Sequence, residues 1–369
     1  MTAPSHVSSE QLYFVAVVVL GLCLLLAVVV VLSKLITTHR RTATQARLAP
    51  LRPHLLAVAS GEDTDGAARA RLIAHRDSRG ELDRALVGVL TKVRGAPADA
   101  LVDVLRERDA VTSTLHASRA SSSVRRARAF RTLGLLRDAD LTTDLLRGLH
   151  DRSPEVRLVS ARAIGAVGPP AGPRAASAVL RAVRTQRTHP GVAAGTATDA
   201  LVRLGITSEP AVRDGLTDDD PGVRLVAATV AGRGLFISCA PQLTGLARTD
   251  PDQLVRVAAT DALGEAGRAD DCPVLVTLTS SDEPAPVRRA AARALGRLGT
   301  PDAVAALEVL LGDADRGLAA AAATALGDSG PGRDTLTRAA ADPDRTAPAV
   351  RAARVTLELL RLRRGTDRA

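Results

Sequence analysis

The sequence predicts an all-α protein, built as a solenoid of paired helices and preceded by a single transmembrane helix. Three observations predict this fold: a helical pattern that recurs about every 32 residues, an uncharged apolar stretch near the N-terminus, and a scarcity of aromatic residues. The 369 residues include three Phe, one Tyr and no Trp, so a core must be built from Ala, Leu and Val. Such small side chains suit close helix pairing and suit a β-sandwich poorly.

The repeated pattern is clearest at residues 282–299, which read DEPAPVRRAAARALGRLG. Its apolar residues fall at helical spacing on one face: Val287, Ala290, Ala291, Ala294, Leu295 and Leu298. We expect Asp282 to cap the N-terminus of this helix and Gly299 to end it. A helix this short cannot bury its apolar face alone, so it requires a partner helix and a neighbouring copy.

The period can be counted from a Val-Arg pair or its equivalent. This pair begins at Val156, Val192, Val223, Val255, Val287, Leu318 and Val350. The successive gaps are 36, 31, 32, 32, 31 and 32 residues. Shorter apolar runs lie between these helices, so each unit is predicted to be two antiparallel helices.

The pattern resembles HEAT repeats, including the short HEAT-like form found in phycobilin lyases, over residues 121–363. The resemblance implies a HEAT-like α-α superhelix in which an Asp and an Arg tie one turn to its neighbour. On this basis we expect the pairs Asp250 with Arg256 and Asp282 with Arg288 to be rungs of a ladder.

Three places depart from the repeat. Ala193 and Ala319 replace the Arg, so the ladder is expected to be interrupted there. The long gap after Val156 contains residues 168–173, which read GPPAGP and predict a rigid loop.

The apolar stretch runs from Tyr13 to Leu32 without a charge. This is about the 20 residues that a helix needs to cross a membrane. A buried core helix or a cleaved signal peptide fits less well, because every face is apolar and no Lys or Arg precedes the stretch. Basic residues follow it from Lys34 onward, which places the N-terminus outside and the solenoid in the cytoplasm. The same basic flank could contact anionic lipid headgroups.

These observations divide the chain into six segments. They are a short N-terminal segment (1–12), a transmembrane helix (13–36), a basic juxtamembrane linker (37–53), a helical N-terminal cap or divergent repeats (54–120), the HEAT-like array (121–363) and a basic tail (364–369).

A net charge of +9 prompts a search for a basic surface. In HEAT-like arrays the second helix of each pair generally lines the concave side, so arginines there could form a partner-binding groove. The candidate residues are Arg126, Arg128, Arg131, Arg289, Arg293, Arg297, Arg351 and Arg354. The competing interpretation, which we favour, is a solvated face whose charges are balanced by nearby acids.

No residues are assigned to catalysis, to a cofactor or to a metal. The seven histidines are scattered, the three cysteines form no paired motif, and no phosphate-binding GxxxxGK sequence occurs. We therefore expect a protein that is not an enzyme.

The leading functional hypothesis is a scaffold for protein–protein interaction, anchored in a bacterial cell membrane. The bacterial source is inferred from the excess of Arg over Lys and the abundance of Ala. The partner would be another protein, itself membrane-associated; an envelope glycosyltransferase is one guess. One alternative is a nucleic-acid-binding HEAT-like protein with a basic groove, which the lack of Trp and Tyr for base stacking disfavours. A second alternative is a bilin-lyase-like enzyme, which the repeat resemblance alone suggests.

Overall fold

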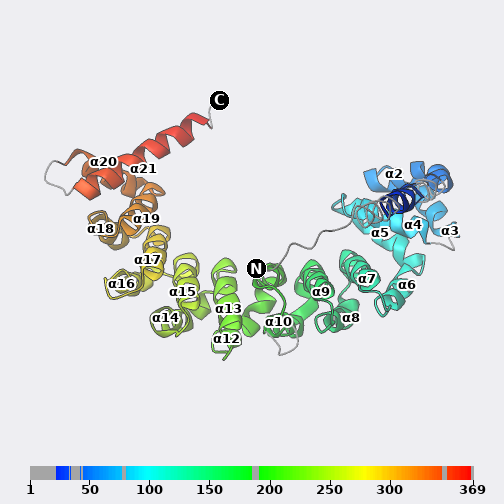
Figure 1. The fold of residues 1–369 in the computed structure, drawn as a ribbon, viewed down its shortest axis with the longest axis horizontal. Coiled ribbons are helices and arrows are strands. Elements are labelled where there is room, and N and C mark those ends of the chain that lie inside the picture. The colour runs from blue at the N-terminus through cyan, green and yellow to red at the C-terminus, as the bar shows by residue number, and fades with distance from the viewer. Residues whose placement is uncertain are drawn as a thin grey trace, which may run out of the picture. The chain divides into compact units, whose positions relative to one another are not determined.

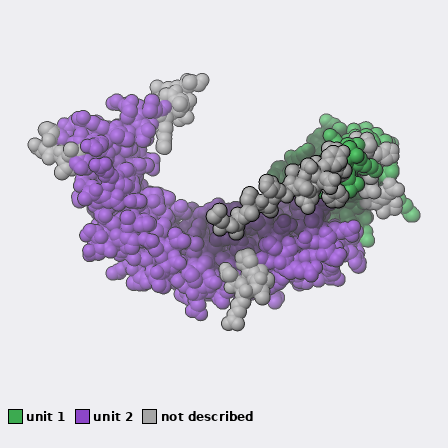
Figure 2. All heavy atoms as spheres, in the orientation of Figure 1, with its two compact units in different colours: residues 1–111 green, residues 112–369 purple. Residues whose placement is uncertain are grey.

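The computed structural model describes residues 22–32, 34, 42, 45–76, 80–184, 191–342 and 347–366. All regular secondary structure in these residues is helical. The chain divides into two compact units, Met1–Val111 and Thr112–Ala369, which Figure 2 distinguishes by colour.

Unit 1 is a small helical bundle. It contains η1 (Ala49–Leu51), α2 (Arg52–Ser60), α3 (Ala67–Ala74), α4 (Glu81–Leu90) and α5 (Ala96–Glu107). Helix α5 packs against the other three α-helices of the unit. Leucines fill the core, and Leu72, Leu82 and Leu101 are fully buried. Helix α6 (Ala110–Ala117) follows and spans the division between the units.

Unit 2 consists of helix pairs arranged in two rows along an arc (Figure 1). The helices on the inside of the arc, called the inner helices, are α7 (Ser123–Leu136), α9 (Pro154–Val167), α11 (Ala194–Leu204), α13 (Pro221–Arg233), α15 (Gln253–Ala266), α17 (Ala285–Leu298), α19 (Arg316–Gly327) and α21 (Ala347–Thr366). The outer helices are α8 (Thr142–Gly148), α10 (Gly172–Arg181), α12 (Glu209–Gly215), α14 (Ala240–Thr249), α16 (Cys272–Thr277), α18 (Pro301–Leu310) and α20 (Gly330–Ala341).

Short 3-10 helices lead into several of the outer helices. They are η2 (Ala139–Leu141), η3 (Pro169–Ala171), η4 (Gly205–Ser208), η5 (Ile237–Cys239) and η6 (Ala269–Asp271). The predicted helix pairs are thus confirmed, and so is the end of α17 at Gly299, which adopts a left-handed φ of 61°. Helix α17 begins differently from the expectation: Pro284 occupies its N-cap position, and Asp282 lies outside the cap.

Five of the inner helices pack closely on the next through a glycine. A Cβ atom added to Gly264 would lie 2.5 Å from the Cα atom of Ala294, so no larger residue fits without a shift. The same contact joins Gly134 to Ala163, Gly165 to Ala200, Gly232 to Ala262 and Gly296 to Ala325. The glycine therefore allows backbones to approach, and its recurrence explains the Leu-Gly sequence near the end of the repeat.

The contact between α11 and α13 lacks this glycine. The register of the repeat places Val202 of α11 at the glycine position and Val230 of α13 at the alanine position. Two small residues are replaced together by two β-branched ones, so this interface has a different packing from its neighbours. It lies beside the predicted irregularity at Ala193.

Half of the predicted transmembrane segment, residues 13–36, lies outside the described residues. Within the described part, residues 22–32 are helical and exposed. Among the residues that the structure describes, no helix is both long enough and apolar enough to cross a membrane.

Candidate partner-binding surface

The exposed side chains of the inner helices form one surface, called here the inner surface. Helix α17 illustrates how it arises: α15 and α19 pack on its two sides, and α16 and α18 pack behind it. Only the side that faces the inside of the arc is left open (Figure 1). On α17 this side carries Arg289, Arg293 and Arg297, spaced one helical turn apart.

These three arginines are paired with acids. Arg293 Nη2 lies 2.8 Å from Asp261 Oδ2, and Arg297 Nη1 lies 3.1 Å from Asp261 Oδ1 on the neighbouring helix α15. Arg289 Nη2 lies 3.2 Å from Asp315 Oδ2, at the start of α19. A hydrogen bond from the Gly317 N–H, together with Arg289, holds the pKa of the Asp315 carboxyl below its usual value. Arg297 Nη2 also lies 4.0 Å from Glu265 Oε1, so three carboxylates neutralise the predicted basic stripe on α17.

Arg126 does not belong to the inner surface, and the prediction that it binds a partner was wrong. Arg126 is only 7% exposed, and its Nε and Nη2 atoms each lie 2.7 Å from a carboxylate oxygen of Asp151. Burial raises the pKa of the Asp151 carboxyl, but hydrogen bonds from Arg126 and from the Ser153 N–H outweigh this effect, so the pKa is lowered. Arg126 thus has a structural role.

Similar buried ion pairs form a ladder that joins successive repeats of unit 2. The Arg224 guanidinium donates two hydrogen bonds to the Asp250 carboxylate, with Nε–Oδ2 at 2.7 Å and Nη2–Oδ1 at 3.0 Å. Each arginine of the ladder also donates a hydrogen bond to a backbone carbonyl of its own repeat. Arg224 Nη1, for example, donates to the Asp218 carbonyl. Because one guanidinium bonds groups of two successive repeats, the ladder fixes the position of each repeat relative to the next.

The ladder pairs differ from those expected. Arg256 pairs with Glu283, and Arg288 Nη2 lies 2.6 Å from Asp313 Oδ2. The arginine therefore reaches the loop of the following repeat, 25 to 27 residues further along the chain. Asp250, which was expected to bind Arg256, binds Arg224 of the preceding repeat instead. Asp282 is exposed and takes no part in the ladder.

The remaining candidates are exposed. Arg128 and Arg131 on α7 have no hydrogen bond or ion pair to another described residue through their side chains. Arg351 and Arg354 on α21 are exposed as well, and Arg354 Nε lies 3.2 Å from the Ala340 carbonyl oxygen.

Two further arginines of the inner surface were not found from the sequence. Arg162 of α9 and Arg203 of α11 are exposed, with no side-chain partner in the described part of the chain. Arg162 lies 31 residues after Arg131, which is one repeat, so counting the period from Arg131 could have found it.

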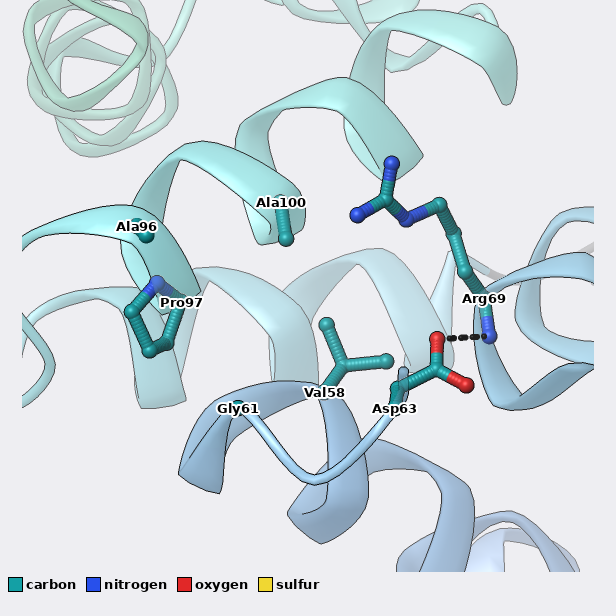
Figure 3. A pocket seen from close by; sticks show the side chains of 7 residues that line it. All are labelled: Val58, Gly61, Asp63, Arg69, Ala96, Pro97 and Ala100. Carbon is teal, nitrogen blue, oxygen red and sulfur yellow. Dashed lines mark hydrogen bonds between the residues drawn. The ribbon is translucent and has the colours of Figure 1, made fainter. Parts of the chain in front are cut away.

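Unit 1 contains a small pocket (Figure 3) of about 180 Å³. It lies among Val58, Gly61, Asp63, Arg69 and the start of α5. The Asp63 carboxylate accepts hydrogen bonds from the Ala68 and Arg69 N–H groups, which caps α3. The volume is below the roughly 300 Å³ of a typical ligand site. Across the described residues, no cluster of three or more His, Cys, Asp or Glu side chains could hold a metal ion.

Comparison with known proteins identifies the repeats. A family model described as HEAT repeats matches residues 209–293, 240–327 and 273–357. No curated protein matches the chain.

Solved structures share the fold. The structure of Kap121p bound to Nup53p has a TM-score of 0.53 and 14% identity, and the match covers 79% of this chain and 37% of that one. A mutant of Kap121p gives a TM-score of 0.52 at 12% identity, with the same coverage of both chains. The CpcE–CpcF complex of phycocyanin lyase from Nostoc sp. PCC7120 has a TM-score of 0.33 and 17% identity, and the match covers 68% of this chain and 94% of that one. This chain spans little more than a third of the Kap121p chains. Residues 209–357 therefore match HEAT repeats, and the helices of unit 2 form a HEAT-like α-helical solenoid.

Proposed function

We propose that this protein is a non-catalytic scaffold whose inner surface binds another protein at a membrane. The observation that carries the proposal is the continuous row of inner helices from α7 to α21, which leaves one long surface open along unit 2. An extended surface of this kind suits a partner that contacts many helices in succession.

A protein is the partner class that we favour. The Kap121p structure with a similar fold holds a bound protein, Nup53p. The inner surface also displays charges of both signs, as the pairs between α15 and α17 illustrate. Mixed charge suits recognition of a polypeptide better than recognition of a uniformly anionic nucleic acid.

The membrane part of the proposal rests on residues 22–32. Their large apolar side chains are 48% to 69% exposed, which is costly in water. The sequence continues this apolar character back to Tyr13, and Lys34 follows it. We propose that the segment anchors the protein with its solenoid in the cytoplasm. Tethering would raise the effective concentration of a membrane-associated partner near the inner surface.

Chemical crosslinking in intact cells of the source organism would test this function. The full chain and a control containing residues 1–44 alone would each be purified from membranes. We expect a protein that crosslinks to the full chain and not to the control. If both capture the same proteins, or if the solenoid captures only nucleic acid, the scaffold proposal is wrong.

A further inference from the structure

The charge of the inner surface changes along the row of helices. On α15 and α17 the arginines Arg293 and Arg297 face Asp261 and Glu265, and the two signs cancel. Four exposed arginines on α7, α9 and α11 have no side-chain partner among the described residues and are considered together: Arg128, Arg131, Arg162 and Arg203. The N-terminal part of the inner surface therefore carries unbalanced positive charge.

Few acids offset this charge. Asp199 of α11 is engaged by Arg233 of α13, with Oδ1–Nη1 at 3.1 Å. Glu155 is exposed in the first turn of α9, two helical turns away from Arg162. We call the set Arg128, Arg131, Arg162 and Arg203 the basic row, since it crosses three successive inner helices.

The spacing of the basic row defines what it fits. Packed helices lie about 8–10 Å apart. A polypeptide in the polyproline II conformation advances about 3.1 Å per residue and has three residues per turn, so every third side chain points to the same side. A chain that crosses the inner helices at right angles would thus present about every third side chain to a new helix.

We propose that the basic row binds an acidic polypeptide segment in polyproline II conformation, with a carboxylate at about every third residue. The inference rests on the scaffold function proposed above and specifies the chemistry of the partner. Arginine suits this task because its planar guanidinium can bind a carboxylate through two hydrogen bonds.

The structure favours a polypeptide over single-stranded nucleic acid. Both phenylalanines in the described residues, Phe130 and Phe236, are buried, at 4% and 5% exposure. The inner surface therefore offers no aromatic ring, within the described part, on which a base could stack.

The test uses the purified full chain and a fluorescein-labelled 12-residue peptide with Glu at every third position, separated by Ala and Ser. Binding is measured by fluorescence anisotropy at low salt. Control probes are the same peptide with Gln in place of Glu, the same composition with its four Glu in one block, and a 12-nucleotide oligo(dT). The test variant is the triple substitution R131E, R162E and R203E.

A matched variant carries R174E, R181E and R248E, which remove three exposed, unpaired arginines from the outer helices α10 and α14. Both triples change the net charge equally, so a general electrostatic effect would appear in both. Circular dichroism checks that both remain helical.

We expect the inner triple to weaken binding of the spaced-Glu peptide about tenfold or more, and the outer triple to change it less than about threefold. The Gln and block peptides should bind more weakly than the spaced peptide. Equal losses in both triples, absence of binding, or tighter binding of oligo(dT) through the same arginines would overturn the inference. A crosslinked protein partner that is retained by the inner triple would overturn it while leaving the scaffold function standing.

Discussion

At the scale of the residue, the arginine of each repeat illustrates what the sequence can and cannot show. The recurrence of Asp and Arg at a fixed period predicts a ladder, and the ladder is present. The partners could not be assigned from spacing, because the guanidinium leaves its helix toward the next unit rather than toward the acid just before it. For the same reason Arg126, which the sequence places among surface arginines, is a buried rung.

The ladder predicts a difference between two aspartates that look equivalent in the sequence. The Asp250 side chain is 2% exposed and binds Arg224, whereas Asp282 is exposed and outside the ladder. Removing one partner of a buried ion pair costs roughly 3–5 kcal/mol. We expect D250N to lower the free energy of unfolding by roughly this amount, measured by urea denaturation.

The variant D282N is the matched control, since it makes the same chemical change at an exposed position. Its effect should be within about 0.5 kcal/mol. Equal destabilisation by both variants would show that the ladder does not stabilise the array. A double-mutant cycle with Arg224→Ala would then measure the pair itself.

At the scale of the element, the helices are the part that the sequence predicts best. Apolar spacing defines the helix faces, and capping residues such as Asp220, which accepts hydrogen bonds from the Gly222 and Val223 N–H groups, mark the helix starts. The two glycines at the end of α17 have different roles, which the sequence does not distinguish. Gly299 ends the helix, whereas Gly296 lets α19 approach. The second role depends on the neighbouring helix and is not encoded locally.

Replacement of glycine by alanine is expected to change the free energy of unfolding in opposite directions at two positions, one between inner helices and one on an outer helix. In G264A the new Cβ atom would lie 2.5 Å from Ala294 Cα, a backbone atom that cannot move alone. We expect a loss of roughly 1–3 kcal/mol in unfolding free energy. The control is G245A on the outer helix α14, where no atom lies within 4 Å of the new Cβ.

G245A should stabilise the protein by roughly 0.4–1 kcal/mol, because alanine restricts the unfolded chain more than glycine does. Thermal or urea unfolding of the two variants measures both effects. Stabilisation by G264A would mean that the inner helices are not in close contact at this point.

At the scale of the whole molecule, the helical solenoid follows from the repeat period, because each unit can bury its apolar face only against the next. The location of the exposed charge does not follow from the period. Arg289, Arg293 and Arg297 look like a basic stripe in one helix, and only the structure shows that acids on the neighbouring helices, Asp261, Glu265 and Asp315, neutralise them. Arg162 and Arg203 are single arginines in their helices, and they become a row only when the helices are placed side by side.

The proposed membrane anchor leads to a prediction at the same scale. We expect the full chain to remain in the membrane fraction after extraction with alkaline carbonate. The double variant L26R and V29R should release it, since each arginine costs roughly 2.5–3.5 kcal/mol at the centre of a membrane helix. A control with L26A and V29A should stay in the membrane. Release of the unmodified chain by carbonate would contradict a transmembrane anchor.

The central claim is that a protein partner lies along the inner surface, and site-specific photocrosslinking in cells tests it most directly. A photoreactive amino acid would replace Thr229 or Thr324 on inner helices, and Thr277 or Thr337 on outer helices. All four threonines donate their hydroxyl to a carbonyl three or four residues earlier in the same helix, so the replacements are closely matched. The account predicts that an inner position crosslinks to a protein partner and that the outer positions do not. Crosslinks from the outer positions alone would contradict it.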